Sequence, residues 1–174
     1  MKRRALLKVG LLGGGLLAVA GSGLQLIPTR RISAPRRPLR YLDATEFAIL
    51  AAAAGRIITV VGADVVAIAH VVDGALEAVS PEARSDFRHL LRLLESALAG
   101  LLLDGRPMNF TRLGPAGQDA ALKAFRDSSL VLRRTGYQAL RKLCAASYYA
   151  NETTWPAIGY PGPPTIPPGT HVDP

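Results

Sequence analysis

Residues 42–149 carry four runs of apolar residues with the 3.6-residue spacing of α-helices, and no run with the alternation typical of a β-strand. A chain of 174 residues is long enough for one domain with its own core. We therefore predict an all-α fold, a small bundle of about four main helices that ends in an extended tail rich in Pro, Gly and aromatic residues. The expected helices cover about 43–59, 65–79, 80–104 and 118–149.

The clearest helix start lies at Asp43, which can accept hydrogen bonds as an N-cap residue. Glu46 stands three positions later, where its carboxylate can bond back to the cap, and Leu42 and Phe47 are spaced for a hydrophobic staple. Together these signals predict that the helical domain starts near residue 42. Farther along the chain, Ser80 is predicted to cap the third helix.

The apolar faces of these helices predict the core. The third helix is expected to bury Phe87, Leu90, Leu91, Leu94, Leu98 and Leu101, and the last to bury Leu122, Phe125, Leu132, Leu140, Leu143, Cys144 and Tyr148. The single cysteine is thus interpreted as a buried, unreactive thiol. Within the last helix, Ser128, Ser129 and Gly136 are possible bends.

The formal net charge of +8 comes entirely from the beginning of the chain. Nine basic and no acidic residues precede Tyr41, whereas twelve basic and thirteen acidic residues lie from Tyr41 onward. The helical domain is therefore nearly neutral, which argues against a nucleic-acid-binding core.

The first 20 residues have the layout of an export signal, with a basic head, an apolar stretch from Val9 to Ala20 and small residues at the end. The head resembles the twin-arginine signal through Arg3, Arg4, Leu6, Leu7 and Lys8. The alternative is a retained membrane anchor, because the charge-free sequence continues to Thr29 and is about long enough to span a bilayer.

Residues 21–41 form a basic arm, in which Pro28 to Arg40 contains three prolines and five arginines without apolar periodicity. Such a composition predicts an extended segment. The arm is either a solvated linker or a contact for an acidic partner surface or lipid headgroups.

Few residues in the helical domain suggest chemistry. The best candidates are His70, Asp73 and Glu77, which share one helical face and could bind a metal or shuttle protons. They lack the Glu-x-x-His motif, repeated on two helices, that di-metal bundles use. A polar stripe that faces solvent or another subunit is the alternative, and we predict no catalytic, cofactor-binding or metal site in this chain.

Residues 151–174 form a tail in which six prolines between Pro156 and Pro168 forbid a continued helix. Trp155 and Tyr160 are large amphipathic side chains of the kind found at interface hot spots. We expect Tyr148 and Tyr149 to complete the core, and the tail beyond them either to lie along a partner or to pack back over its own bundle. The predicted partner interface comprises Trp155, Pro156, Ile158, Tyr160, Pro161 and Pro163.

The end of the chain also carries a family resemblance. The stretch from Arg133 to Leu140, the pair Tyr148-Tyr149 and the segment from Trp155 to Pro164 resemble the carboxy-terminal signature of the gluconate 2-dehydrogenase subunit 3 family. Leu42 to Phe47 and Asp86 to Glu95 also fit, so the resemblance covers about residues 42–164.

The resemblance implies a small, non-catalytic subunit of a membrane-bound flavin dehydrogenase that oxidises sugars, sugar acids or related alcohols. It implies a large catalytic partner that binds FAD, of the glucose–methanol–choline oxidoreductase type, and a multihaem cytochrome c partner that carries haem c. It further implies that this subunit stabilises the catalytic subunit and escorts it through the twin-arginine machinery to the periplasm. A stand-alone exported protein-binding module and a metal-dependent enzyme remain the alternatives.

Overall fold

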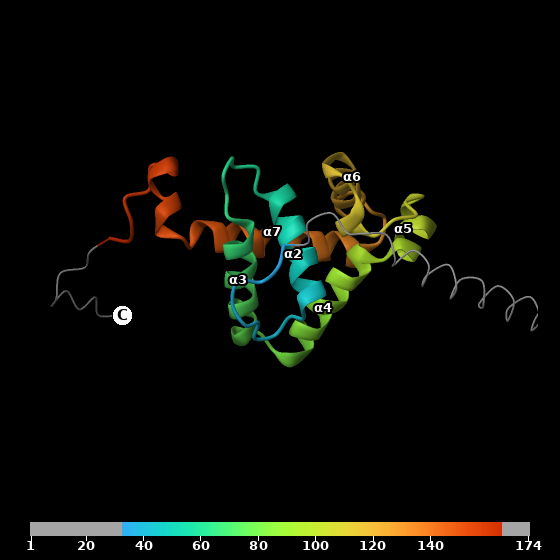
Figure 1. The fold of residues 1–174 in the computed structure, drawn as a ribbon, viewed down its shortest axis with the longest axis horizontal. Helices are drawn as coiled ribbons and strands as arrows, with labels where there is room; N and C mark the ends of the chain where they lie inside the picture. The colour runs from blue at the N-terminus through green and yellow to red at the C-terminus, as the bar shows by residue number, and fades with distance from the viewer. Residues whose placement is uncertain (1–32, 165–174) are drawn as a thin grey trace, which may run out of the picture.

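The computed structural model describes residues 33–164, and this range is helical without strands, as predicted (Figure 1). The predicted export signal, Arg3, Arg4, Leu6, Leu7 and Lys8, lies outside the described residues. The α-helices are α2 (Ala44–Ile57), α3 (Val65–Ala75), α4 (Pro81–Glu95), α5 (Ala97–Asp104), α6 (Pro115–Arg126) and α7 (Val131–Tyr149). Single 3-10 turns are η2 (Leu76–Ala78), η3 (Phe110–Arg112), η4 (Glu152–Thr154) and η5 (Pro156–Ile158).

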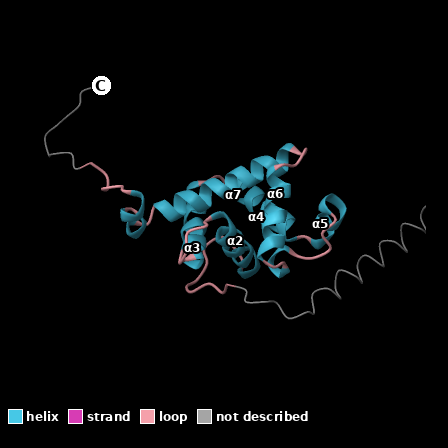
Figure 2. Ribbon diagram, turned by 90° about the horizontal axis from the view of Figure 1, so that it is seen from above, coloured by secondary structure: helices cyan, strands magenta, loops and turns pink. Residues whose placement is uncertain are grey.

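Helix α2 is the central helix of the bundle and contacts α3, α4, α6 and α7 (Figures 1 and 2). The predicted capping box begins it: the Glu46 N–H donates to Asp43 Oδ1 at 2.8 Å, and the Asp43 N–H donates to Glu46 Oε2 at 3.0 Å. The alanines of α2 let its neighbours approach closely on several sides. Its Phe47 and Leu50 are completely buried, together with Phe110 of η3.

The structure divides the predicted third helix at Ser96 into α4 and α5. Ser96 has an extended backbone (φ −61°, ψ 115°), and its hydroxyl accepts the Ala99 N–H at 3.1 Å, so it ends one helix and caps the next. The change of direction turns Leu98 and Leu101 outward, and the prediction that they lie in the core is wrong. Phe87, Leu91 and Leu94 of α4 are buried as predicted.

The predicted last helix is divided in the same way between α6 and α7, at the serine pair that was a possible bend. As a result Leu132, predicted for the core, is 74% exposed at the start of α7. Gly136 is not a bend but a close contact, because a Cβ there would collide with the side chain of Leu90 on α4. Cys144 is fully buried, and burial raises the pKa of its thiol to about 12.

Among the described residues, no helix combines the length and the apolar character needed to cross a bilayer.

Candidate partner interface

The tail begins where α7 ends, and its first residues are tied to that helix. Asn151 Oδ1 accepts the backbone N–H of Thr153 at 3.1 Å, and the hydroxyl of Thr154 donates to the carbonyl of Asn151 at 2.8 Å. Tyr148 is half-buried against the core, but Tyr149 is largely exposed. The prediction that both tyrosines complete the core is therefore right for Tyr148 only.

Trp155 organises the rest of the tail into a folded hook, which we define as residues 151–164. Its indole Nε1–H donates to the carbonyl of Tyr149 at 2.9 Å. Its ring meets the ring of Tyr160 edge to face, with centroids 5.2 Å apart and planes at 78°. Gly159 and Gly162 take positive φ values of 68° and 104°, which let the chain turn back past the indole.

The hook contains two short helical turns, η4 and η5, inside a range that we predicted as extended. Both turns are compatible with the prolines, because Pro156 lies at the first position of η5, where it lacks only an N–H that needs no partner. Asn151, in turn, supplies the side-chain cap of η4. The prolines thus exclude a long helix but allow single turns.

The hook projects from the bundle beyond the end of α7 (Figures 1 and 2). Ile158 is 53% exposed and Tyr160 43% exposed, and the predicted interface residues Pro156, Pro161 and Pro163 are also exposed. Only the base of the hook faces the bundle, across a groove of about 280 Å³ whose other wall includes Val60 to Asp64. Between residues 151 and 164, the tail therefore does not pack back over the bundle.

The polar trio on α3 serves the N-terminal arm. The carboxylate of Asp73 is buried and accepts three consecutive backbone N–H groups, from Arg40 at 2.8 Å, Tyr41 at 3.0 Å and Leu42 at 2.9 Å. These bonds use the lone pairs that a metal ligand would need. They also place the arm against α3 directly before the start of α2.

His70 and Glu77 continue this contact. The backbone N–H of Arg36 donates to Nε2 of His70 at 3.1 Å, so that nitrogen must carry no proton. Burial, and next the nearby charge of Arg37, lower the pKa of His70. Glu77 forms an exposed ion pair with Arg40 at 2.9 Å.

The trio is therefore neither a metal site nor a free polar stripe, and the docked part of the arm, residues 33–41, is not a solvated linker. No group of three His, Cys, Asp or Glu side chains between residues 33 and 164 is arranged to hold a metal ion.

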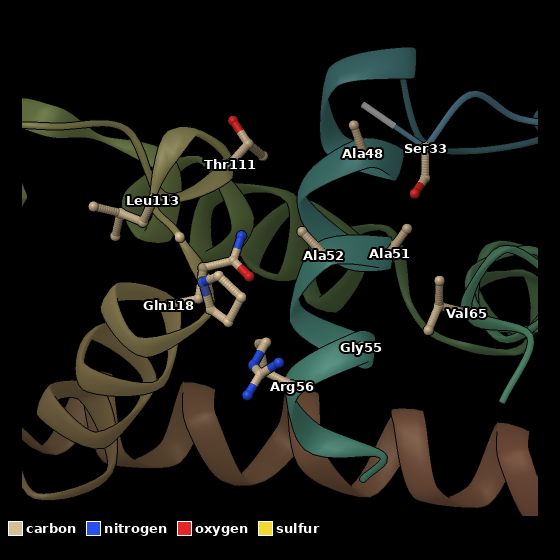
Figure 3. A pocket seen from close by; sticks show the side chains of 12 residues that line it. Ser33, Ala48, Ala51, Ala52, Gly55, Arg56, Val65, Thr111, Leu113 and Gln118 are labelled. Atoms are coloured by element: carbon tan, nitrogen blue, oxygen red, sulfur yellow. The ribbon is translucent and has the colours of Figure 1, made fainter. Parts of the chain in front are cut away.

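A cavity of about 560 Å³ lies beside α2 and is lined by Ala48, Ala52 and Gly55 of that helix and by residues of η3 and the start of α6 (Figure 3). Three of its polar side chains, Arg56, Thr111 and Gln118, already have structural partners. The guanidinium of Arg56 binds both carboxylate oxygens of Asp119 at 2.7 and 2.6 Å, which lowers the pKa of that carboxyl. The Thr111 hydroxyl donates to Glu95 at 2.6 Å, and the Gln118 amide donates to the carbonyl of Phe110 at 3.3 Å. We assign no chemical step to this cavity.

Three ion pairs that each include a buried side chain were missed by sequence reasoning. Glu46, predicted only as part of the capping box, also accepts Nε of Arg88 at 2.8 Å and Nη2 of Arg92 at 2.9 Å, which joins α2 to α4. Arg133, at the start of α7, donates to both oxygens of Asp104 at 3.0 and 2.7 Å. The charge of a residue is visible in the sequence, but its partner on another helix is not.

A family model described as Gluconate 2-dehydrogenase subunit 3 matches residues 44–162, which is more than half of the chain. This range includes all the α-helices described above and most of the hook. No curated protein and no solved structure matches the chain.

Proposed function

Because the chain belongs to the gluconate 2-dehydrogenase subunit 3 family, we propose that it is a non-catalytic accessory subunit that holds the catalytic subunit of a flavin dehydrogenase. The family is that of a dehydrogenase subunit, which supports a place in a multi-subunit complex. In this proposal the complex oxidises a sugar, a sugar acid or a related alcohol in the periplasm. FAD belongs to the catalytic subunit and haem c to a cytochrome subunit that passes electrons to the respiratory chain.

The hook is the observation that carries this proposal. It presents exposed aromatic, aliphatic and proline side chains on a segment whose shape is already fixed by the Trp155 hydrogen bond and the Trp155–Tyr160 contact. A preformed segment loses less conformational entropy on docking than a flexible one. Trp and Tyr are also the residues most enriched at the energetic centres of interfaces.

The escort role rests on the leader. Twin-arginine export accepts folded proteins, so a subunit with that signal can carry a flavin-loaded partner that has none. In this proposal Arg3 and Arg4 address the complex to the export machinery, and the docked arm joins the leader to the folded bundle.

Co-expression with the catalytic subunit tests both roles. We expect flavin-loaded catalytic subunit in the periplasm with the native chain, and its loss when Arg3 and Arg4 are both replaced by Lys. The matched control is Arg36→Lys with Arg37→Lys, which changes the same residue type in the arm and should leave export intact. Export and activity of the catalytic subunit in cells without this chain would contradict the proposal.

A further inference from the structure

The end of the bundle opposite the hook exposes a set of aliphatic side chains. An ordinary surface helix turns its large apolar residues toward the core. Helix α5 does the opposite, because the small residue Gly100 is its buried position and its leucines are exposed. Leu102 is 75% exposed. Figures 1 and 2 both place α5 and the hook at opposite ends of the molecule.

The start of α7 adds to the same end. Leu130, Val131 and Leu132 are exposed there. The buried ion pair between Asp104, the last residue of α5, and Arg133 joins the two segments. The guanidinium of Arg133 also lies 4.2 Å from the ring centroid of Phe125, which fixes it further. We call this surface the leucine end: Leu98, Leu101, Leu102, Leu103, Met108, Leu130, Val131 and Leu132.

An exposed basic side chain at the leucine end favours an anionic partner. Asp104 and Asp127 are ion-paired with Arg133 and Arg126, and Glu95 accepts the hydroxyl of Thr111 and lies near the charge of Arg106. Arg134 donates to the backbone carbonyls of Ser128 and Ser129, at 2.6 and 2.9 Å, so these contacts leave its charge uncompensated. Arg106, directly after α5, is half-buried: it donates to the carbonyls of Met108 and Leu94, and the carboxylates of Asp104 and Glu95 lie near its charge.

We propose that the leucine end is a peripheral membrane contact, in which the exposed leucines enter the outer part of an anionic phospholipid bilayer while the exposed Arg134 meets the headgroups. Aliphatic side chains beside basic ones are the arrangement that binds such surfaces. A protein interface of this size would be expected to centre on an exposed Trp or Tyr, whereas the exposed large apolar side chains of the leucine end are all aliphatic. The proposal is independent of the flavoprotein partner.

A label at Leu102 tests the proposal locally, and the chain is well suited to it. The native thiol, Cys144, is buried with its pKa raised to about 12, so it does not react with a thiol-directed dye under mild conditions. The full-length Leu102→Cys variant is labelled with an environment-sensitive fluorophore and mixed with vesicles of phosphatidylglycerol and phosphatidylcholine in equal parts. The matched control is Val61→Cys, because Val61 is 100% exposed in the loop between α2 and α3, away from the leucine end.

We expect the emission at position 102 to shift to the blue and to be quenched by a lipid-borne quencher, with a weaker effect on vesicles of phosphatidylcholine alone. The label at position 61 should not respond. A silent label at 102, or an equal response at both positions, overturns the proposal. A blue shift at position 102 that appears without vesicles, when the concentration of this chain is raised or when the catalytic subunit is added, also overturns the proposal. It would assign the surface to a protein contact.

A second pair of variants measures affinity. We expect Leu102→Gln combined with Leu132→Gln to weaken vesicle binding at least about tenfold, because two side chains of this size no longer leave water for an apolar phase. Val61→Gln should bind as the native chain does, and any contribution of residues 1–32 is common to all three proteins. Circular dichroism verifies that each variant is folded, and equal affinity of the folded double variant contradicts the proposal.

Discussion

Single buried acidic residues attach the segments of this protein to one another. Asp73 holds the arm through three backbone N–H groups, and Glu46 combines a helix cap with ion pairs to two arginines of α4. Buried carboxylates are tolerated when their oxygens are fully hydrogen-bonded. The sequence predicted Glu46 as a capping residue because that role depends on local spacing, but it could not reveal Asp73 as an anchor because its partners lie over thirty residues away.

Replacing Asp73 with Ala should lower the free energy of unfolding by about 3 kcal/mol, because three backbone N–H groups lose a charged acceptor at once. Urea denaturation measures the difference. Glu77→Ala is the matched control on the same side of the bundle: its ion pair with Arg40 is exposed, so the loss should stay below about 0.5 kcal/mol. Equal effects of the two changes would show that Asp73 does not anchor the arm.

His70 should make stability depend on pH near neutrality. Its pKa is lowered in the folded protein by burial, and next by Arg37, whereas in the unfolded chain it returns to about 6.5. The unfolded chain therefore binds the proton first as the pH falls, so the free energy of unfolding should decrease below about pH 6.5. Protonation of His70 at Nε2 would also break the hydrogen bond that this nitrogen accepts from the Arg36 N–H.

Urea denaturation at about pH 7.5 and pH 5.5 measures this loss, and His70→Gln should reduce it because Gln can accept the bond without titrating. An identical pH dependence in both proteins would rule out the assigned role of His70.

At the scale of elements, the helices themselves were predictable and their breaks were not. The capping signals at Asp43 and Ser80 were correct because caps depend on a few neighbouring residues. The break at Ser96 carries no Gly or Pro, and the apolar spacing continues across it, so the sequence pattern favoured one helix. The turned helix α5 consequently exposes the leucines that the pattern assigned to the core.

Two helical glycines should respond in opposite ways to the same substitution. A Cβ at Gly100 of α5 would lie 2.7 Å from the carbonyl oxygen of Arg106, so Gly100→Ala should destabilise the protein by about 1 kcal/mol or more. A Cβ at Gly74 of α3 would meet no neighbouring atom within 4 Å, so Gly74→Ala should stabilise the protein by about 0.5 to 1 kcal/mol through helix propensity. Thermal unfolding of both variants measures the two shifts, and a shift of the same sign would contradict the packing described for α5.

At the scale of the whole molecule, the bundle separates two exposed surfaces. The hook lies at one end of α7, and the leucine end lies at the other (Figure 1). The residues of the hook could be named from the sequence because aromatic and proline side chains stand out in a tail that cannot form a long helix. The leucine end could not be predicted from the sequence, because it depends on where two helices break and on the pairing of Asp104 with Arg133.

The most direct test of the accessory role is the affinity of the purified chain for the catalytic subunit, with and without the Trp155 side chain. We predict that Trp155→Ala weakens the complex by about 2 kcal/mol or more, because the indole both offers contact area and holds the hook in shape. Leu102→Ala, an exposed change at the opposite end of the bundle, should leave the affinity unchanged. A Trp155→Ala variant that binds the catalytic subunit as tightly as the native chain would contradict the account.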